Sequence, residues 1–169
     1  MATQAEHVQH PIAPVFDERS RVLLLGSFPS PKSRELGFFY AHPQNRMWRV
    51  LAAVAGEDGA PQTTPQRRAF LLRHGIAMYD VIACCRISGA SDASIADAVP
   101  TDLSPLLSAS PIQAVFTTGA KATQLYERHQ LARTGLPATR LPSTSAANAA
   151  WGLDALVAAY RAALGPYVL

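Results

Sequence analysis

The chain has few cysteines and no long apolar segment, and both absences narrow what it can be. Its only two cysteines, Cys84 and Cys85, are adjacent. Neighbouring cysteines rarely bridge each other, and without a Cys-x-x-Cys or Cys/His set this pair indicates neither a zinc site nor a four-cysteine iron–sulfur cluster. No apolar run approaches the ~20 residues of a membrane span. We therefore expect no metal site and no membrane attachment.

The N-terminal stretch MATQAEHVQHPIAP lacks the basic start and the apolar core of a secretory signal. We interpret residues 1–18 as a partly ordered arm and residues 19–169 as a single domain, because 169 residues fit one domain of common size. The cytoplasm is the default location for such a chain. Nothing in the sequence calls for oligomers, so we expect a monomer.

The charge balance is mildly basic, with a net charge of +3 and a pI of about 9.1. That balance is compatible with a phosphate-rich partner but does not require one. There is no dense run of Lys and Arg. Any contact with DNA would therefore have a small footprint, helped by backbone amides and hydroxyls.

Apolar runs and helical spacings alternate along the chain. Strands are predicted at 21–26, 76–83, 114–118 and 139–141, and helices at 45–56, 64–75, 119–130 and 147–164, with a short helix opening near 100 and a polar loop at 86–92. Such alternation is typical of an α/β fold with a parallel sheet and helices on both faces. Polar motifs follow the predicted strands. Because ligands of open α/β folds bind at the carboxyl edge of the sheet, one site is predicted there.

Three sequence runs carry the chemistry. Gly-Ser-Phe-Pro-Ser at 26–30 breaks the first apolar strand, Tyr-Ala-His-Pro-Gln-Asn-Arg-Met-Trp follows at 40–48, and Leu-Pro-Ser-Thr-Ser-Ala-Ala-Asn lies at 141–148. In this order, the three runs resemble the motifs of the uracil-DNA glycosylase superfamily. The middle run is similar to the mismatch-specific uracil/thymine branch and closer still to the hypoxanthine-DNA glycosylase branch. The resemblance covers roughly residues 20–151, most of the chain.

The resemblance implies a three-layer sandwich, in which helices flank a central four-stranded parallel sheet. It also implies a monofunctional DNA glycosylase that hydrolyses the N-glycosidic bond of deaminated bases, hypoxanthine first, in base-excision repair. Reaching that bond in a duplex requires extrusion of the nucleotide into a pocket. Water can make the attack, so neither a nucleophilic lysine nor a cofactor is implied. The expected partner is DNA containing a deaminated base.

Tyr40 and Asn45 are the central site candidates, and each has a structural alternative. By resemblance, Tyr40 lies under the flipped base, where stacking contributes ~1–3 kcal/mol; alternatively, it packs its loop onto the core. Many superfamily members place an Asp or Asn within the first motif to activate water, but here Phe28 holds that position. The hypoxanthine branch resembles this chain in having no Asp or Asn at that position, and its essential Asn matches Asn45. An amide can orient water or the sugar, although Asn45 could also cap the helix that follows.

Asp80 interrupts an apolar strand, where an unpaired carboxylate is costly. An ionised Asp only accepts hydrogen bonds, so it would favour hypoxanthine, which has an N1–H, over adenine, which has a lone pair there. It would also tolerate the N3–H of uracil and so does not settle specificity. The alternatives for Asp80 are an ion pair with Arg86 or a helix cap. His42 is expected either to donate to the base or a phosphate, or to fix its loop by bonding to the backbone.

The remaining candidates line the pocket or contact DNA. Gly26 and Ser27 are expected to offer backbone N–H groups to the base pocket, beside Phe28. Arg46 and Lys121 are candidate phosphate contacts. The hydroxyls of the second-motif loop are expected to bind phosphates that flank the lesion: Ser143, Thr144 and Ser145. Alternatively, these hydroxyls cap the helix that follows. The loop has only small residues at the place where a bulky wedge is expected.

Three alternative functions stay open at this stage. The first is a uracil or thymine mismatch glycosylase, against which Phe28 in the first motif argues. The second is an inactive relative that binds lesion-containing DNA without releasing a base. The third is a nucleotide-binding protein, but the chain has neither a Gly-x-x-x-x-Gly-Lys-Ser/Thr loop nor a Gly-x-Gly-x-x-Gly motif.

Overall fold

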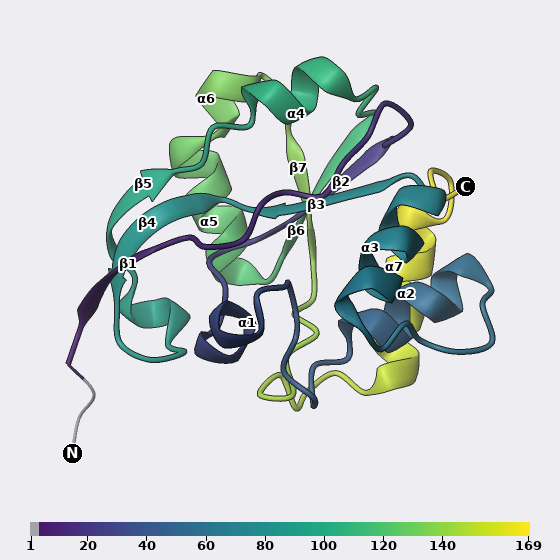
Figure 1. The fold of residues 1–169 in the computed structure, drawn as a ribbon, viewed down its shortest axis with the longest axis horizontal. Coiled ribbons are helices and arrows are strands. Elements are labelled where there is room, and N and C mark those ends of the chain that lie inside the picture. The colour runs from purple at the N-terminus through teal and green to yellow at the C-terminus, as the bar shows by residue number, and fades with distance from the viewer. Residues whose placement is uncertain (1–3) are drawn as a thin grey trace.

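A parallel four-stranded sheet forms the centre of the protein in the computed structural model, which describes residues 4–169 (Figure 1). Its spatial order is β3-β2-β6-β7, and each neighbouring pair is parallel. The strands are β2 (Val22–Gly26), β3 (Ile76–Asp80), β6 (Ala114–Thr118) and β7 (Ala138–Leu141). The predicted α/β architecture, a four-stranded parallel sheet flanked by helices, is therefore confirmed.

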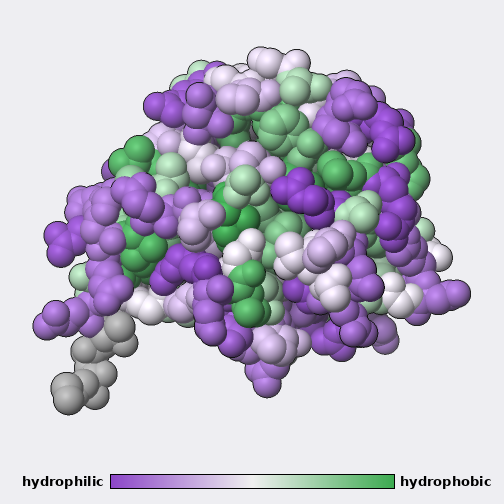
Figure 2. All heavy atoms as spheres, in the orientation of Figure 1, coloured by the Kyte–Doolittle hydropathy of each residue, from purple (hydrophilic) through white to green (hydrophobic). Residues whose placement is uncertain are grey.

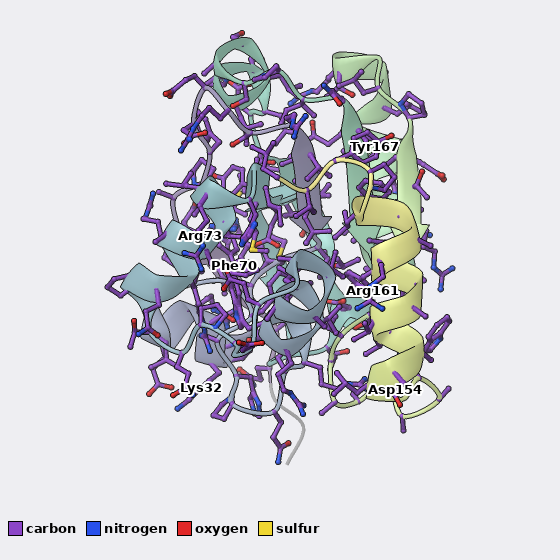
Figure 3. The ribbon with its side chains drawn as sticks, turned by 90° about the vertical axis from the view of Figure 1, so that its right-hand side faces the viewer. Lys32, Phe70, Arg73, Asp154, Arg161 and Tyr167 are labelled. Atoms are coloured by element: carbon purple, nitrogen blue, oxygen red, sulfur yellow. The ribbon has the colours of Figure 1, made fainter. Side chains whose placement is uncertain are left out.

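Helices cover both faces of this sheet (Figure 1). On one side lie α2 (Met47–Ala55), α3 (Thr64–Arg73) and α7 (Leu153–Leu164); toward the other lie α4 (Ser104–Ala109), α5 (Ala120–His129) and α6 (Leu131–Thr134). Figure 3 looks onto the first layer, with Phe70 and Arg73 on α3 and with Arg161 on α7. Arg161 joins two of these helices, because its guanidinium donates to the carbonyl of Ala53 in α2 at 3.1 Å.

The apolar run of β2 is unbroken because the strand is buried on both faces. Val22 and Leu24 pack in the core that α2, α3 and α7 share, whereas Leu23 and Leu25 pack in a second core with Leu125 of α5. Central parallel strands covered by helices read as continuous apolar runs rather than as alternating ones. Because β2 lies between β3 and β6, its end and the turn after it lie in the middle of one sheet edge.

A second, antiparallel sheet lies beside the first, and the sequence pattern did not predict it. Its order is β1-β4-β5, with β1 (Glu6–Gln9), β4 (Ile82–Ile87) and β5 (Ala96–Pro100). β1 belongs to the segment interpreted as an N-terminal arm, residues 1–18, of which 1–3 lie outside the described residues. Farther along that segment Ile12 and Val15 are buried, and Val15 bridges Met78 of β3. This segment therefore runs against the end of β3, next to Asp80.

The single strand predicted at 76–83 is wrong, because two strands divide that stretch. β3 ends at Asp80, and β4 begins at Ile82 in the other sheet. The N–H groups of Val81 and Ile82 donate to two carbonyls at the end of β2 and just after it, at 2.8 and 3.2 Å, which fixes the crossing point. Both halves are apolar, so hydropathy alone does not mark the change of sheet. Because β4 continues to Ile87, the predicted polar loop also starts later than expected.

Two predicted helices begin later than expected. The helix predicted at 45–56 is α2, which begins at Met47, and the one predicted at 147–164 is α7, which begins at Leu153. Residues 146–150 are Ala-rich and have high helix propensity. However, the guanidinium of Arg46 binds three carbonyls of this region, those of Ser145, Asn148 and Trp151. A helix would need such carbonyls as acceptors for its own N–H groups, so the segment forms turns instead.

The face drawn in Figure 2 has hydrophilic side chains along its rim and apolar side chains toward its middle. Large apolar residues with high exposure occur singly on different elements: Leu36, Val99, Leu131, Trp151 and Leu169. Single exposed apolar side chains are common and carry no functional signal. Among the described helices, none combines the length and the apolar character that a bilayer crossing needs.

Candidate active site

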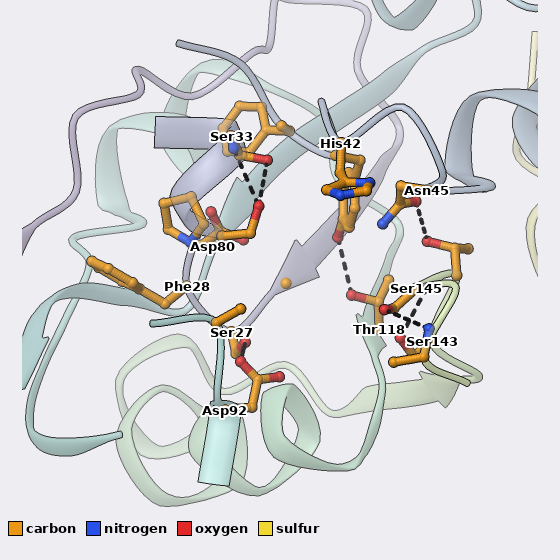
Figure 4. Close-up of a pocket in the computed structure, with 18 of the residues that line it drawn as sticks. Ser27, Phe28, Ser33, His42, Asn45, Asp80, Asp92, Thr118, Ser143 and Ser145 are labelled. Carbon is orange, nitrogen blue, oxygen red and sulfur yellow. Dashed lines mark hydrogen bonds between the residues drawn. The ribbon is translucent and has the colours of Figure 1, made fainter. Parts of the chain in front are cut away.

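A pocket of about 370 Å³ opens at the carboxyl edge of the parallel sheet (Figure 4). Side chains reach it from the turn after β2, the loop before α2, the end of β3 and the loop after β7. Arg46 and Lys121 do not line it. Most of the predicted site residues do: Gly26, Ser27, Phe28, Tyr40, His42, Asn45, Asp80, Ser143, Thr144 and Ser145. The fold thus brings segments more than a hundred positions apart into one pocket at the expected edge, while the roles of these residues stay predictions.

Tyr40 stands against the sheet edge, and its hydroxyl is hydrogen-bonded to Oγ1 of Thr118 at 3.0 Å. A β-carbon on Gly26 would lie 3.0 Å from that hydroxyl and 2.5 Å from Oδ1 of Asp80, so glycine is required for both groups to approach the strand end. Tyr40 has a φ of 48°, in the left-handed region that bulky residues rarely adopt. Burial, with the charge of Asp80 adding to it, raises the pKa of Tyr40 well above its usual value, so the phenol stays neutral.

Asp80 is paired with a residue that the sequence did not suggest. Nε2 of His10 lies 2.8 Å from Oδ2 of Asp80, and both side chains are almost fully buried. Nδ1 of His10 accepts the N–H of Ile12 at 3.1 Å, which assigns the ring proton to Nε2 as the donor to the carboxylate. Neither alternative considered for Asp80, an ion pair with Arg86 or a helix cap, is present in the described structure. The other carboxylate oxygen, Oδ1, lies beside Gly26 at the pocket wall.

Asn45 is held by two hydrogen bonds to its single side-chain oxygen. Oδ1 accepts the N–H of Met47 at 2.9 Å and the hydroxyl of Thr144 at 2.8 Å. The first bond closes the turn that leads into α2, but the N-cap residue of α2 is Arg46, so Asn45 is not itself the cap that the sequence suggested. The second bond joins the middle sequence run to the second-motif loop. A carbonyl oxygen with two donors is saturated, which leaves the amide N–H groups of Asn45 as the part that can act in the pocket (Figure 4).

His42 is exposed at the pocket rim, and its Nδ1 accepts the N–H of Gln44 at 3.1 Å. The predicted alternative, in which the ring fixes its own loop, is therefore observed. The same bond assigns the ring proton to Nε2. Nε2–H can donate to a base or a phosphate, so the two predicted roles of His42 are compatible.

Arg46 shapes the second-motif loop from inside. Besides the three carbonyls named above, its Nε donates to the carbonyl of Thr144 at 3.3 Å. Within the loop, the Ser143 hydroxyl accepts the N–H of Ser145 at 3.2 Å, and the Asn148 amide donates to the Ser143 carbonyl at 2.9 Å. The loop hydroxyls therefore order the loop rather than cap a helix. The guanidinium therefore already donates to backbone carbonyls. A contact between Arg46 and a DNA phosphate stays a prediction.

Asp92 and Thr118 line the pocket as well, although neither is among the site residues predicted from the sequence. Asp92 opens the short 3₁₀ turn η1 (Asp92–Ser94), and its Oδ1 accepts the hydroxyl of Ser27 at 2.9 Å. Although the residue as a whole is exposed, partial desolvation raises the pKa of the Asp92 carboxyl. The charge of Asp80 adds to this, against the lowering effects of Ser27 and Lys121. The only hint in the sequence was the position of Asp92 in a polar loop that follows an apolar strand.

The two cysteines lie apart from this chemistry. Both are free thiols on β4, and burial raises the pKa of Cys85 to about 11. Within residues 4–169, no group of three or more His, Cys, Asp and Glu side chains is arranged to hold a metal ion.

The three motif runs all lie within the part of the chain that matches a family model. The model of the Uracil DNA glycosylase superfamily matches residues 13–164. The chain belongs to the uracil DNA glycosylase superfamily. The match begins before β2, inside the N-terminal segment, and ends at the last residue of α7.

Relatives and a solved structure support the same assignment. The chain is 33% identical over 110 residues to the hypoxanthine DNA glycosylase of Methanosarcina barkeri, covering 64% of this chain and 70% of the relative. It is 31% identical over 135 residues to the hypoxanthine DNA glycosylase of Methanosarcina acetivorans, covering 79% and 84% respectively. The solution NMR structure of a Methanosarcina acetivorans protein assigned to the uracil DNA glycosylases superposes with a TM-score of 0.72 at 28% identity, covering 96% of this chain and 98% of that one.

Proposed function

We propose that this protein is a monofunctional DNA glycosylase that hydrolyses the bond between C1′ and a deaminated base, with hypoxanthine favoured, in base-excision repair. The superfamily membership and the two relatives named hypoxanthine DNA glycosylase support the reaction class. The preference for hypoxanthine is supported by one observation: a fixed hydrogen-bond acceptor and a fixed hydrogen-bond donor line the same pocket. Asp80 is the acceptor, held by His10, and the amide of Asn45 is the donor.

This acceptor and donor match the hydrogen-bonding edge of hypoxanthine. The base presents an N1–H donor next to the O6 acceptor, so N1–H can donate to Asp80 Oδ1 and O6 can accept from the Asn45 amide. Adenine presents the reverse pattern at the same two positions and would face acceptor with acceptor and donor with donor. A flipped base is read through such edge contacts and by stacking, and the ring of Tyr40 supplies the stacking surface. Selection against adenine is essential, since adenine is abundant in DNA.

Asn45 also has a catalytic role in this proposal. As the glycosidic bond breaks, negative charge builds on the departing base and positive charge on the sugar. A donor fixed before the reaction stabilises that developing negative charge without reorganising. The two bonds to Asn45 Oδ1 provide this fixation. Asn45 therefore acts as a donor to the leaving group, and not as a base.

The rest of the pocket is proposed to hold DNA. Residues 143–145 line the pocket and are suited to bind phosphates that flank an extruded nucleotide. Gly26 and Ser27 also line it and are proposed to offer backbone N–H groups to the base, beside Phe28. Arg46 and Lys121 remain further candidates for phosphate contact. We propose that residues 19–169, together with the N-terminal segment that supplies His10, act as one catalytic domain, as a monomer in the cytoplasm, with DNA as the partner and no cofactor.

A uracil or thymine mismatch glycosylase is the second candidate function. The specific observation in its favour is again Asp80, because the N3–H of uracil would also find an acceptor there. An inactive relative that only binds lesion-containing DNA is the third candidate.

Base release from defined oligonucleotides tests the proposal. The protein is incubated with end-labelled duplexes that carry one hypoxanthine, uracil, xanthine or mismatched thymine, and abasic sites are then cleaved with alkali. Cleavage mainly at hypoxanthine is expected. Cleavage mainly at uracil or thymine would move the protein to the mismatch branch. Binding to the lesion duplex without cleavage would support the inactive relative.

A further inference from the structure

Asp92 is a carboxylate of the pocket that base recognition does not use. It reaches the pocket from η1, after β4, and its Oδ1 is held by the hydroxyl of Ser27 at 2.9 Å. Ser27 directly precedes Phe28, which by the resemblance described above stands where many members of the superfamily carry a water-activating Asp or Asn. The carboxylate of Asp92 is therefore tethered next to the place where that group is missing.

Hydrolysis needs an acceptor for the proton of the attacking water, and the other candidates in the pocket are occupied. The oxygen of Asn45 already accepts two hydrogen bonds. One oxygen of Asp80 is bound to His10, and under the proposed function the other reads the base. Asp92 uses only one oxygen for Ser27, and Figure 4 shows the second oxygen turned away from that bond.

The surroundings of Asp92 suit a base. The charged and titratable groups that act on it come from four places: Tyr40 in the loop before α2, Asp80 on β3, Cys85 on β4 and Lys121 on α5. The residue is exposed at the pocket, yet partial desolvation of its carboxyl is the main cause that raises the pKa of Asp92, and Asp80 raises it further. A carboxylate with a raised pKa is a stronger proton acceptor while still ionised near neutral pH.

We infer that Asp92 is a catalytic residue that positions the attacking water and accepts its proton, supplying from the loop after β4 the function that Phe28 cannot perform. The C1′–N bond breaks with its electron pair on the base, and the water oxygen bonds to C1′. One water proton passes to Asp92 and then to solvent, and the base anion takes a proton from solvent. The products are the free base and an abasic sugar with a C1′ hydroxyl. The inference rests on the proposed glycosylase function.

Single-turnover base release by Asp92→Asn tests this role. Asn keeps an oxygen for the Ser27 hydroxyl but cannot take a proton, so the tether survives and the base is lost. We expect hypoxanthine release to slow by about 100-fold, within the range of general base catalysis, while affinity for the duplex is unchanged. Asp97→Asn is the matched control, because Asp97 is exposed on β5 and does not line the pocket. Its φ of 51° is one that Asn tolerates, and its rate should equal that of the wild type.

Two further readouts separate catalysis from a structural role. The wild-type rate should rise with pH as Asp92 ionises, and this rise should be absent in Asp92→Asn. Formate should restore part of the rate of Asp92→Ala but not that of Asn45→Ala. A rate for Asp92→Asn within about twofold of the wild type, or a rise with pH that survives in it, would overturn the inference. Absence of base release by the wild type would overturn the proposed function itself.

Discussion

His10 donates from Nε2 to Oδ2 of Asp80 across 2.8 Å, and the two residues are 70 positions apart in the chain. His10 is packed among the rings of Phe28, Phe39 and Tyr79, with centroid distances of 5.8, 6.1 and 5.1 Å. The imidazole is therefore fixed, and it fixes the carboxylate in turn. A base-reading group at the sheet edge thus depends on the N-terminal segment.

Replacing His10 should weaken both stability and base selection. His10→Leu leaves a buried carboxylate without its donor and should lower the free energy of unfolding by about 1–3 kcal/mol. His10→Gln should restore much of this loss, since its amide nitrogen reaches about as far as Nε2. Denaturant unfolding measures the first effect, and the ratio of hypoxanthine to uracil release measures the second. Equal ratios in Leu and Gln variants would limit His10 to a packing role.

Asn45→Asp should abolish most base release although the fold is kept. The aspartate can still accept from Met47 and Thr144, but it replaces a donor by an acceptor that faces the leaving base. Loss of one fixed donor to a developing anion costs about 100- to 1,000-fold in rate. Single-turnover rates for Asn45→Asp and Asn45→Ala, with thermal unfolding as the control, measure this. An unchanged rate in folded Asn45→Ala would remove Asn45 from the mechanism.

Asp80→Asn should change which base is released. The amide can present a donor to the pocket, so the variant should lose preference for N1–H and accept adenine more readily. A wrongly matched hydrogen bond of this kind costs about 1–3 kcal/mol, which corresponds to a change of about fivefold to 150-fold in the rate ratio. Parallel assays on hypoxanthine, uracil and adenine give that ratio. If all three relative rates stayed as in the wild type, Asp80 would have only a structural role.

Arg46→Ala should loosen the second-motif loop. The variant removes the donors that hold the carbonyls of Ser145, Asn148 and Trp151, at a cost of about 2 kcal/mol in stability. Hydrogen exchange should accelerate most at residues 143–151, well beyond the smaller increase that the stability loss causes elsewhere in the chain. A phosphate contact predicts something else: unchanged exchange with a reduced salt dependence of DNA binding.

The sequence predicted those features that local pattern controls. The run Val22–Gly26 is apolar throughout because β2 is buried on both faces, and the polar motifs after it lie at the carboxyl edge because the strands are parallel. The pocket could therefore be placed at one edge, and half of its lining residues could be named. These residues sit within or beside recognisable motifs, so neither their partners nor their distances were needed to find them.

The features that were missed depend on contacts between distant segments. The partner of Asp80 comes from a stretch with no motif, and the division of the 76–83 run at Val81 follows from backbone bonds to the end of β2. The late start of α7 follows from Arg46, because its guanidinium binds carbonyls more than ninety positions away. Asp92 was missed for a similar reason, since only its bond to Ser27 brings it to the pocket. Propensity and periodicity contain none of this information.

The structure of the protein bound to a duplex that carries 2′-fluoro-deoxyinosine tests the central claim most directly, because the fluorine slows bond cleavage and traps the flipped base. The account predicts N1 of hypoxanthine about 3 Å from Asp80 Oδ1 and O6 about 3 Å from the Asn45 amide nitrogen, with the ring against Tyr40. A base bound in the reverse orientation, or with its edge away from Asp80 and Asn45, would contradict it.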